Sequence, residues 1–329
     1  MQKKLIYLVL FSSITLFSSS CNIPFREPLL KISEEYHLDF LSEFLESNKL
    51  EEIENSPVEN DQGAHEHGTS SEHDKNHGHS KKHKKHHSAS SGKQVHQIDH
   101  SILWVQNSAE YSALCHQAYN NAAYRLEEKL NKYESKKKAA IILDLDETVL
   151  DNSPFSAKLF LDNKDYSDTA WDKWVELADA EAIPGAKTFL DEIDPSKVEI
   201  FYVSNRHIKH LDATFENLKK LEIPVKKENI LLREDSSSKE LRRELIAENH
   251  EILLLIGDNL IDFTDIFDAH PSSQFRYRLM ETLHDEYGDK FIVLPNPNYG
   301  QWLSALYNYN YDLSREEKFD IAKQSLLSF

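Results

Sequence analysis

The stretch AAIILDLDETVLDN, residues 139–152, decides the fold that we expect for this chain of 329 residues. Its first part, Ala140 to Leu143, is a short apolar run, typical of a strand that is buried on both faces. The run ends in two carboxylates, Asp144 and Asp146. Open α/β sheets bind ligands at the carboxyl ends of their strands, so we expect these charges at such an edge. A strand followed by an acidic turn without function is the alternative for so short a motif.

Further apolar runs downstream also end in polar residues. They are Val198–Val203, Ile252–Ile256 and Phe291–Leu294, and a shorter run lies at Ile230–Leu232. Helical patterns separate these runs, which predicts an α/β fold with a doubly wound, Rossmann-like parallel sheet. The polar residues that follow the second and third long strands are Ser204, Asn205, Arg206, Asp258 and Asp262. Lys239 follows three serines and opens a helix between these strands.

This order of motifs resembles the haloacid dehalogenase (HAD) superfamily of phosphatases, with D-x-D-x-T, then Ser, then Lys, then G-D-x-x-x-D. Four segments are similar to the class C acid phosphatases typified by bacterial lipoprotein e, a 5′-nucleotidase family: LDLDETVLDNSP (143–154), YVSNR (202–206), GDNLID (257–262) and LPNPNYG (294–300). The resemblance runs from about Trp104 to about Leu306. It implies a HAD-like core with a smaller helical domain, built from the preceding helix and the insertion after the first core strand.

The resemblance also implies a metal site. The carboxylates of Asp144 and Asp258 and the backbone carbonyl of Asp146 would bind Mg²⁺, with Asp262 in the outer coordination sphere or reaching the metal through water. Oxygen ligands at strand ends suit this ion.

The same residues permit phosphoryl transfer through an aspartate. Asp144 is the expected nucleophile, which forms an aspartyl-phosphate. Asp146, whose side chain we expect to be free for the purpose, is the expected general acid and base. Ser204 and Lys239 would bind the phosphoryl oxygens and offset their charge. The alternatives are a solvated helix lysine for Lys239 and a helix N-cap for Ser204, which could serve both purposes.

Substrate specificity is expected from the insertion and the last loop. The resemblance places Trp171 and Tyr299 as two aromatic faces around a nucleobase, where stacking contributes about 1–3 kcal/mol. Two rings buried in the core are the alternative. Asn205 and Arg206 lie near the phosphate by sequence and are assigned to substrate binding, with their individual roles open.

Residues 1–21 are predicted to be a lipoprotein signal peptide. Lys3 and Lys4 precede a mostly apolar stretch that is short for a membrane span, and three serines precede Cys21. This pattern resembles a bacterial lipoprotein cleavage site, with Cys21 as the lipid-bearing residue. We therefore expect a lipid-anchored protein of the cell envelope, with the outer membrane favoured. A secreted or periplasmic protein is the alternative.

Composition divides the rest of the chain into three predicted segments. Residues 22–56 are predicted to form an amphipathic acidic helix. Residues 57–100 form a His-rich linker that we expect to be disordered, and its histidines from His65 to His87 could bind transition metals or be incidental to a spacer. Residues 101–329 are the predicted phosphatase domain, with a helical subdomain from about 101–135 and 152–182. The tail from Asn308 is polar and is expected to be peripheral.

Charge and cysteine content argue against several classes of function and site. The formal net charge of −18 argues against a general nucleic-acid binder. Apart from Cys21 the chain has one cysteine, Cys115, so no internal disulfide is expected. Cys115 and His116 are neighbours on a predicted helix that runs from Ile102 to about Glu134. Neighbours on a helix point in different directions, so a small buried side chain fits Cys115 better than a catalytic dyad.

The sequence therefore favours a cell-surface, Mg²⁺-dependent acid phosphatase. Its expected substrates are nucleoside monophosphates such as AMP or nicotinamide mononucleotide (NMN). One alternative is a metal- or haem-binding surface lipoprotein that uses the His-rich segment, with the phosphatase secondary. Deleting residues 60–95 would separate the two hypotheses. If hydrolysis persists and metal uptake is lost, both functions exist; if the intact protein shows no hydrolysis, the binding function is favoured. A phosphotransferase or phosphonatase of the same superfamily is a further alternative.

Overall fold

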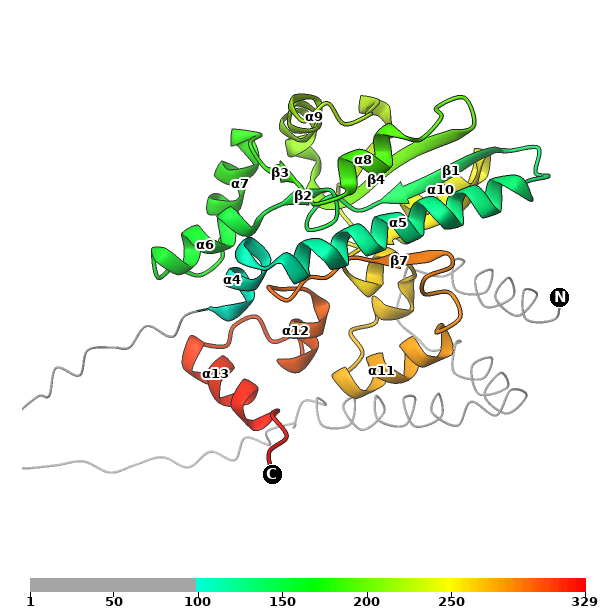
Figure 1. Cartoon of the computed structure of the whole chain (residues 1–329). Coiled ribbons are helices and arrows are strands. Elements are labelled where there is room, and N and C mark those ends of the chain that lie inside the picture. The colour runs from blue at the N-terminus through cyan, green and yellow to red at the C-terminus, as the bar shows by residue number, and fades with distance from the viewer. Residues whose placement is uncertain (1–98) are drawn as a thin grey trace, which may run out of the picture. The chain divides into compact units, whose positions relative to one another are not determined.

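The computed structural model describes residues 99–329 (Figure 1). The predictions for the signal peptide, Cys21 and the acidic helix lie outside the described residues, as does the His-rich linker up to residue 98. Asp99 and His100, the last two residues of the predicted linker, instead cap and begin a helix. Within residues 99–329, no helix combines the length and the apolar character needed to cross a membrane.

A five-stranded parallel sheet forms the centre of the fold. Its strand order is β5-β4-β1-β6-β7. The strands are β1 (Lys138–Leu143), β4 (Val198–His207), β5 (Ile230–Arg233), β6 (His250–Gly257) and β7 (Phe291–Val293). β1 is the middle strand, and it pairs in parallel with β4 on one side and β6 on the other. The chain changes direction across the sheet at β1, so the crevice beyond its carboxyl end is where a ligand site is expected. The predicted α/β class and strands are confirmed.

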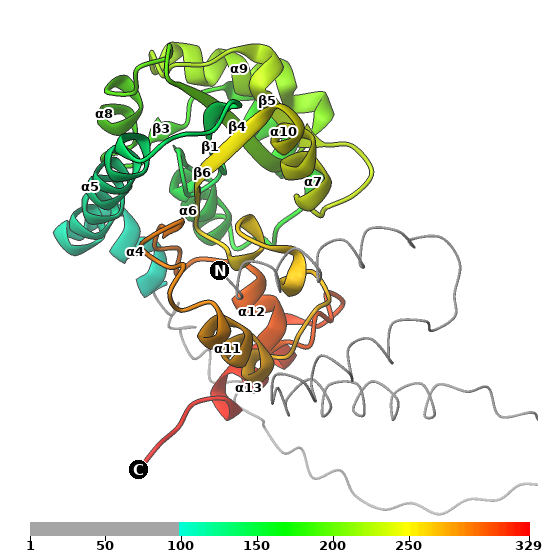
Figure 2. The same ribbon diagram turned by 90° about the vertical axis from the view of Figure 1, so that its right-hand side faces the viewer.

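Alternate side chains of the strands point into two layers of helices. One layer is α5 (Ala109–Asn131) with α8 (Ala186–Asp191), and the other contains α10 (Glu240–Asn249), as Figure 2 shows. Burying each large aliphatic side chain in such a core stabilises the fold by about 1.5–3 kcal/mol. In the α5 layer the strand residues pack on a helical stripe that consists of Tyr111, Cys115, Tyr119, Ala122 and Leu126. Cys115 is fully buried, as expected of a small apolar side chain.

The predicted helix from Ile102 to about Glu134 is two helices. α4 (His100–Asn107) ends at Ser108, and α5 starts immediately afterwards. The backbone N–H of Ser108 donates to the carbonyl of Trp104, while its hydroxyl accepts from the backbone N–H of Tyr111 at 3.1 Å. One serine therefore ends the first helix and caps the second, and the side-chain cap competes with continuation of the helix.

The insertion after β1 lies beyond the carboxyl end of that strand (Figure 1). It contains β2 (Leu150–Asp151), α6 (Ser153–Leu161), α7 (Asp168–Leu177) and β3 (Glu181–Ala182). β2 and β3 form a separate antiparallel pair. The helix predicted around Trp171 and Trp174 is α7, and the 3-10 turn η1 (Ile208–His210) with α9 (Leu211–Lys220) follows β4.

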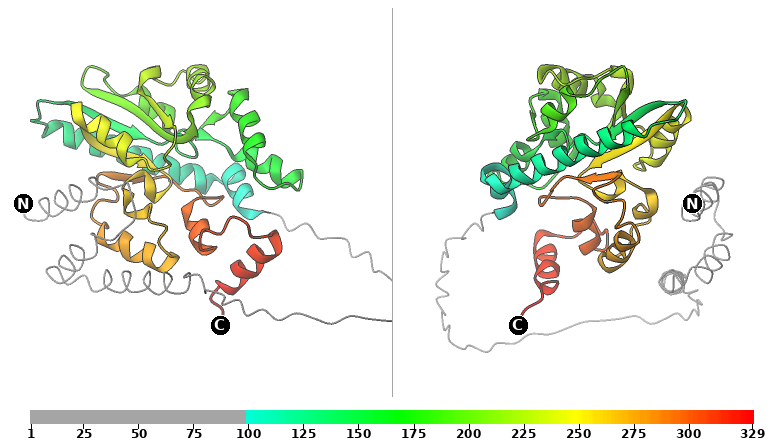
Figure 3. Two further views of the ribbon diagram at one scale, coloured as in Figure 1. Left: turned by 180° about the vertical axis from the view of Figure 1, so that it is seen from behind. Right: turned by 45° about the vertical axis from the view of Figure 1, so that its right-hand side comes forward.

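The C-terminal part gathers beyond the β7 edge of the sheet, coloured orange to red in both views of Figure 3. It contains α11 (Ser273–Thr282), α12 (Gln301–Leu306) and α13 (Arg315–Gln324). The remaining elements are short 3-10 turns: η2 (Lys227–Asn229), η3 (Leu260–Asp262) and η4 (Asp265–Phe267). The tail that we expected to be peripheral is thus partly helical, and it also lines the cavity described below.

Candidate active site

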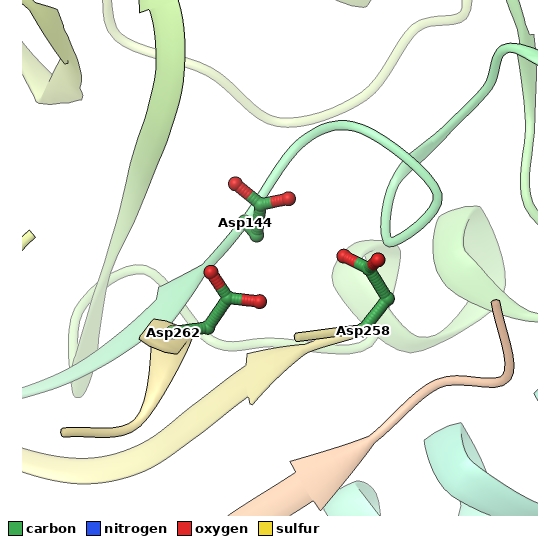
Figure 4. Close-up of side chains that lie close together, drawn as sticks. All are labelled: Asp144, Asp258 and Asp262. Atoms are coloured by element: carbon green, nitrogen blue, oxygen red, sulfur yellow. The ribbon is translucent and has the colours of Figure 1, made fainter. Parts of the chain in front are cut away.

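Three carboxylates meet at the carboxyl edge of the central strands. Asp144 follows β1, while Asp258 and Asp262 follow β6, and each offers an oxygen within 4.8 Å of the other two. Figure 4 shows these carboxylates facing a common space. The β1–β6 ladder brings them together, because the backbone N–H of Asp144 donates to the carbonyl of Ile256 at 2.9 Å. The sequence prediction that distant acids converge at this edge is confirmed.

Lys239 is the buried cation of this cluster. It precedes α10, is 4 % exposed, and donates from Nζ to Asp144 and, at 2.6 Å, to Asp262. Burial raises the pKa of Asp144 to about 7, although the charge of Lys239 opposes the shift. The pKa of Asp258 is also raised, mainly by burial and then by the negative charges of Asp262 and Asp144. Burial alone would lower the pKa of Lys239, but the two carboxylates outweigh it and raise that pKa. The alternative of a solvated helix lysine is therefore wrong.

The carboxyl of Asp146 is held by three donors, so our expectation of a free side chain needs correction. Its Oδ1 accepts from Asn152 Nδ2 at 2.8 Å and from Arg206 Nη2 at 2.8 Å and Nε at 2.9 Å. Its Oδ2 has longer contacts, 3.2 Å to Arg206 Nε and 3.3 Å to Ser204 Oγ. Oδ1 is thus saturated with donors, which leaves Oδ2 as the oxygen that can exchange a proton with a substrate.

Asn152 links Asp146 to the inserted helices. It is 1 % exposed, and its backbone N–H donates to Glu147 at 2.9 Å. Its Oδ1 accepts from the indole nitrogen of Trp174 on α7 at 2.7 Å. Sequence reasoning missed this residue, because an asparagine before a helix is ordinarily only a cap. Here it forms no side-chain cap, and its amide joins the D-x-D loop to the insertion.

We expect Trp174→Phe to lower kcat about three- to tenfold and to leave KM nearly unchanged. An aromatic ring is kept, but Asn152 Oδ1 loses its short hydrogen bond and retains only Arg206 Nη2 at 3.5 Å. A hydrogen bond contributes about 1 kcal/mol. Asn152 would then hold the Asp146 carboxyl less firmly. The check is kcat and its pH profile for the variant and for Trp104→Phe, whose indole makes no hydrogen bond in the described structure. An unchanged kcat and pH profile in Trp174→Phe would disprove this role for the Asn152 amide.

Ser204 lies inside β4, so the helix N-cap interpretation is wrong. The strand continues through polar residues to His207, which pairs with Arg233 of β5. Ser204 Oγ accepts from the backbone N–H of Arg206 at 3.1 Å. Arg242 of α10, which the sequence did not single out, donates to the carbonyl of Ser204 and to Asn205 Oδ1, both at 2.6 Å. Arg242 therefore holds the backbone of Ser204 and the side chain of Asn205 in place at the end of β4.

Gly257 is required by the packing of Asp262. A Cβ at position 257 would lie 2.4 Å from Asp262 Oδ2. That oxygen accepts from the backbone N–H of Asn259 at 2.9 Å, and the other carboxylate oxygen accepts from Lys239. Asp262 therefore cannot move aside without losing both contacts.

We expect Gly257→Ala to lower the free energy of unfolding by about 1–3 kcal/mol, the usual cost of overpacking. The displaced Asp262 carboxylate should also lower kcat/KM at least tenfold, since it belongs to the acidic cluster. Thermal melting and steady-state kinetics measure both effects. Ile292→Val on β7 is the control, since it should cost similar stability and keep activity. Full activity in Gly257→Ala would show that the position of Asp262 does not matter.

A cavity of about 1030 Å³ opens from the acidic cluster. Every residue that the sequence assigned to the site, apart from Cys21, lines it. Trp171 is partly buried, with its ring centroid 5.2 Å from that of Phe155 and its ring 5.7 Å from the Arg206 guanidinium carbon. Tyr299 is 38 % exposed. The core interpretation is therefore wrong for Tyr299, and the arrangement of the two rings around a base stays a prediction.

Two further side chains orient Asp258. Asn296 Nδ2 donates to its Oδ2 at 2.8 Å, and Thr148 Oγ1 lies 3.4 Å from its Oδ1. Asn296 belongs to the LPNPNYG segment, so that motif supplies a contact to the acidic cluster as well as Tyr299. Nothing in the sequence alone marks Asn296 as a partner of Asp258.

The donor set fits a divalent cation. All three side chains of the cluster are carboxylates, and hard oxygen ligands suit Mg²⁺ or Ca²⁺. Asp144 and Asp258 would hold the ion. Asp262 is occupied on both oxygens by Lys239 and Asn259, which agrees with an outer position. The predicted role of the Asp146 backbone carbonyl stays a prediction.

A family model described as "HAD superfamily, subfamily IIIB (Acid phosphatase)" matches residues 65–302, more than half of the chain. The chain belongs to this family. The resemblance inferred from the motifs, the HAD-like fold and the predicted enzyme class, phosphomonoesterase, all agree with membership of the subfamily.

The chain is also similar to solved structures and to curated proteins. A class C acid phosphatase from Bacillus anthracis is 44 % identical, with a TM-score of 0.67 over 70 % of this chain and 96 % of that one. A structure titled as that phosphatase with tungstate bound is 43 % identical, with a TM-score of 0.66 over the same shares. The stem 31 kDa glycoprotein of Glycine max is 25 % identical over 150 residues, which is 44 % of this chain and 58 % of that protein. Acid phosphatase 1 of Solanum lycopersicum is 31 % identical over 77 residues, 23 % of this chain and 30 % of that protein. Each curated relative is matched over less than two thirds of its length.

Proposed function

We propose that this chain is a Mg²⁺-dependent acid phosphatase that hydrolyses nucleoside monophosphates such as AMP and NMN. The observation that carries the proposal is the buried cluster of Asp144, Asp258, Asp262 and Lys239 at the inner end of a cavity far larger than a phosphoryl group. Membership of subfamily IIIB and a solved relative that holds the oxyanion tungstate support the proposal.

The reaction would proceed in two steps. In the first, an Asp144 oxygen attacks phosphorus, the bond from phosphorus to the leaving oxygen breaks, and an aspartyl-phosphate forms. Asp146 Oδ2 gives its proton to the leaving alkoxide. In the second, water attacks the phosphorus, Asp146 takes up its proton, and inorganic phosphate leaves the restored carboxylate.

The remaining groups position and neutralise the transferred phosphoryl group. A divalent cation held by Asp144 and Asp258 would supply positive charge that reduces the repulsion between the carboxylate nucleophile and the phosphate. Lys239 adds a buried positive charge beside Asp144, and Ser204 offers a hydroxyl. Arg206 orients Asp146 rather than standing free for the phosphate.

The test is a panel of phosphomonoesters assayed with Mg²⁺ and with EDTA. We expect hydrolysis of AMP and NMN near pH 5–6, restored by Mg²⁺ after chelation and absent with EDTA. Phosphorylated proteins and bis-esters serve as poor-substrate controls. Activity that survives exhaustive chelation would contradict the metal requirement, and failure to cleave any monoester would contradict the function.

The location is proposed from residues 1–21 alone. A lipid on Cys21 would anchor the enzyme in the cell envelope, with the outer membrane favoured, so that nucleosides are released outside the cell. Metabolic labelling with palmitate should mark the wild type and fail to mark Cys21→Ala. A labelled variant would disprove lipidation at this cysteine.

A further inference from the structure

We propose that residues 307–318 form the outer wall of the substrate cavity and favour leaving groups of nucleoside size over small ones. The inference rests on the proposed function and names a specificity element within it. This segment lies beyond residue 302, where the match to the family model ends.

The segment brings an aromatic surface to the cavity. Tyr307, Tyr309 and Tyr311 line it from one side, and Trp171 lines it from the insertion. Tyr309 is fixed, since its hydroxyl donates to the carbonyl of Pro271 at 3.0 Å. The catalytic groups lie at the inner end, so an aromatic leaving group that extends outward from the phosphate would meet these rings, where stacking on tyrosine is favourable.

An ion pair closes this wall against the insertion. Arg315 donates from Nε to Asp165 at 2.7 Å and from Nη1 to Asn163 at 2.5 Å, both in the loop between α6 and α7. The position of Arg315 is set by the start of α13, where Ser314 and Glu317 form a capping box. The contacts join residues about 150 positions apart in sequence, and Arg315 and Asn163 both line the cavity.

The exposure of this contact indicates that it can open. The side chains of Arg315 and Asp165 are 49 % and 75 % exposed, and exposed ion pairs hold their partners weakly. The wall can therefore open to admit substrate and close again. A small ester bound at the inner end would not reach the segment and should not sense whether the pair is made.

The experiment compares AMP with glycerol 2-phosphate, a small aliphatic ester, using the full chain with Mg²⁺. The variants are Arg315→Ala and Tyr311→Ser, and the control is Lys323→Ala, an exposed residue of α13 outside the cavity. We expect KM for AMP to rise about two- to fivefold in both variants with kcat unchanged. Both kinetic constants for glycerol 2-phosphate should stay within about twofold, and the control should match the wild type.

Equal shifts for both substrates, or no shift for either, would overturn the proposed role of the segment. Wild-type protein that cleaves neither ester would instead reject the proposed function, so the two failures are distinguishable. Melting curves verify folding. If Arg315→Ala has a lowered melting temperature, Asp165→Ala removes the other partner of the same ion pair. Its KM values for the two esters are then judged by the same criteria.

Discussion

Asp144→Asn should lower kcat for AMP by on the order of a thousandfold or more while the protein stays folded. The amide cannot form an acyl-phosphate, so the whole covalent route is lost rather than one stabilising contact. Folding should survive because the amide has the same shape and its oxygen can still accept from Lys239. Steady-state kinetics with saturating Mg²⁺ and a thermal melt measure the two properties.

The matched control is Asp235→Asn, an exposed residue that does not line the cavity, which should behave as wild type. A loss of activity confined to low Mg²⁺ and rescued at high Mg²⁺ would mean that Asp144 only binds the ion. Activity within tenfold of wild type at saturating Mg²⁺ would reject Asp144 as the nucleophile.

Lys239→Met should lower kcat by about a hundredfold or more and also destabilise the fold. The amine is buried between Asp144 and Asp262, and removing one partner of a buried ion pair costs about 3–5 kcal/mol. Burial already raises the pKa of Asp144 to about 7, and Lys239 opposes that shift. Without the amine that pKa rises further, and a group with a raised folded-state pKa loses stability as pH increases.

The deficit in unfolding free energy should therefore be small near pH 3, where Asp144 is protonated in the folded protein and largely protonated in the unfolded one, and large near pH 8. Denaturant titrations in EDTA at both pH values measure it, with exposed Lys136→Met as the control. A deficit that is equal at the two pH values would mean that lost packing, and not uncompensated charge, explains the loss.

The strands could be predicted from sequence because they are buried on both faces. In β1 every residue from Ala139 to Leu143, on both faces of the strand, is 3 % exposed or less, so the whole run is apolar and is recognisable in the sequence. The end of β4 could not be predicted this way. Asn205, Arg206 and His207 are polar, and only pairing with β5 and the contacts made by Arg242 keep them in the strand.

The acids of the site could be predicted because strand ends in a parallel sheet converge whatever the connecting helices do. The partners of those acids could not. Arg206 binds Asp146 across 60 positions in sequence, and Trp174 binds Asn152 across 22. These contacts depend on the paths of the loops, which no local sequence pattern predicts. The prediction of a peripheral C-terminal tail was incomplete. Its tyrosines are spaced among polar residues, a composition typical of an exposed surface, and the sequence does not show that a cavity lies beside them.

The most direct test of the covalent mechanism is to trap the intermediate. Borohydride added during turnover of AMP reduces an acyl-phosphate to an alcohol, which would convert Asp144 into homoserine in the peptide that mass spectrometry identifies. We predict homoserine at position 144, appearing only with substrate and Mg²⁺. Unmodified Asp144 during continuous turnover, or reduction at Asp146 or Asp258 instead, would contradict the assignment of the nucleophile.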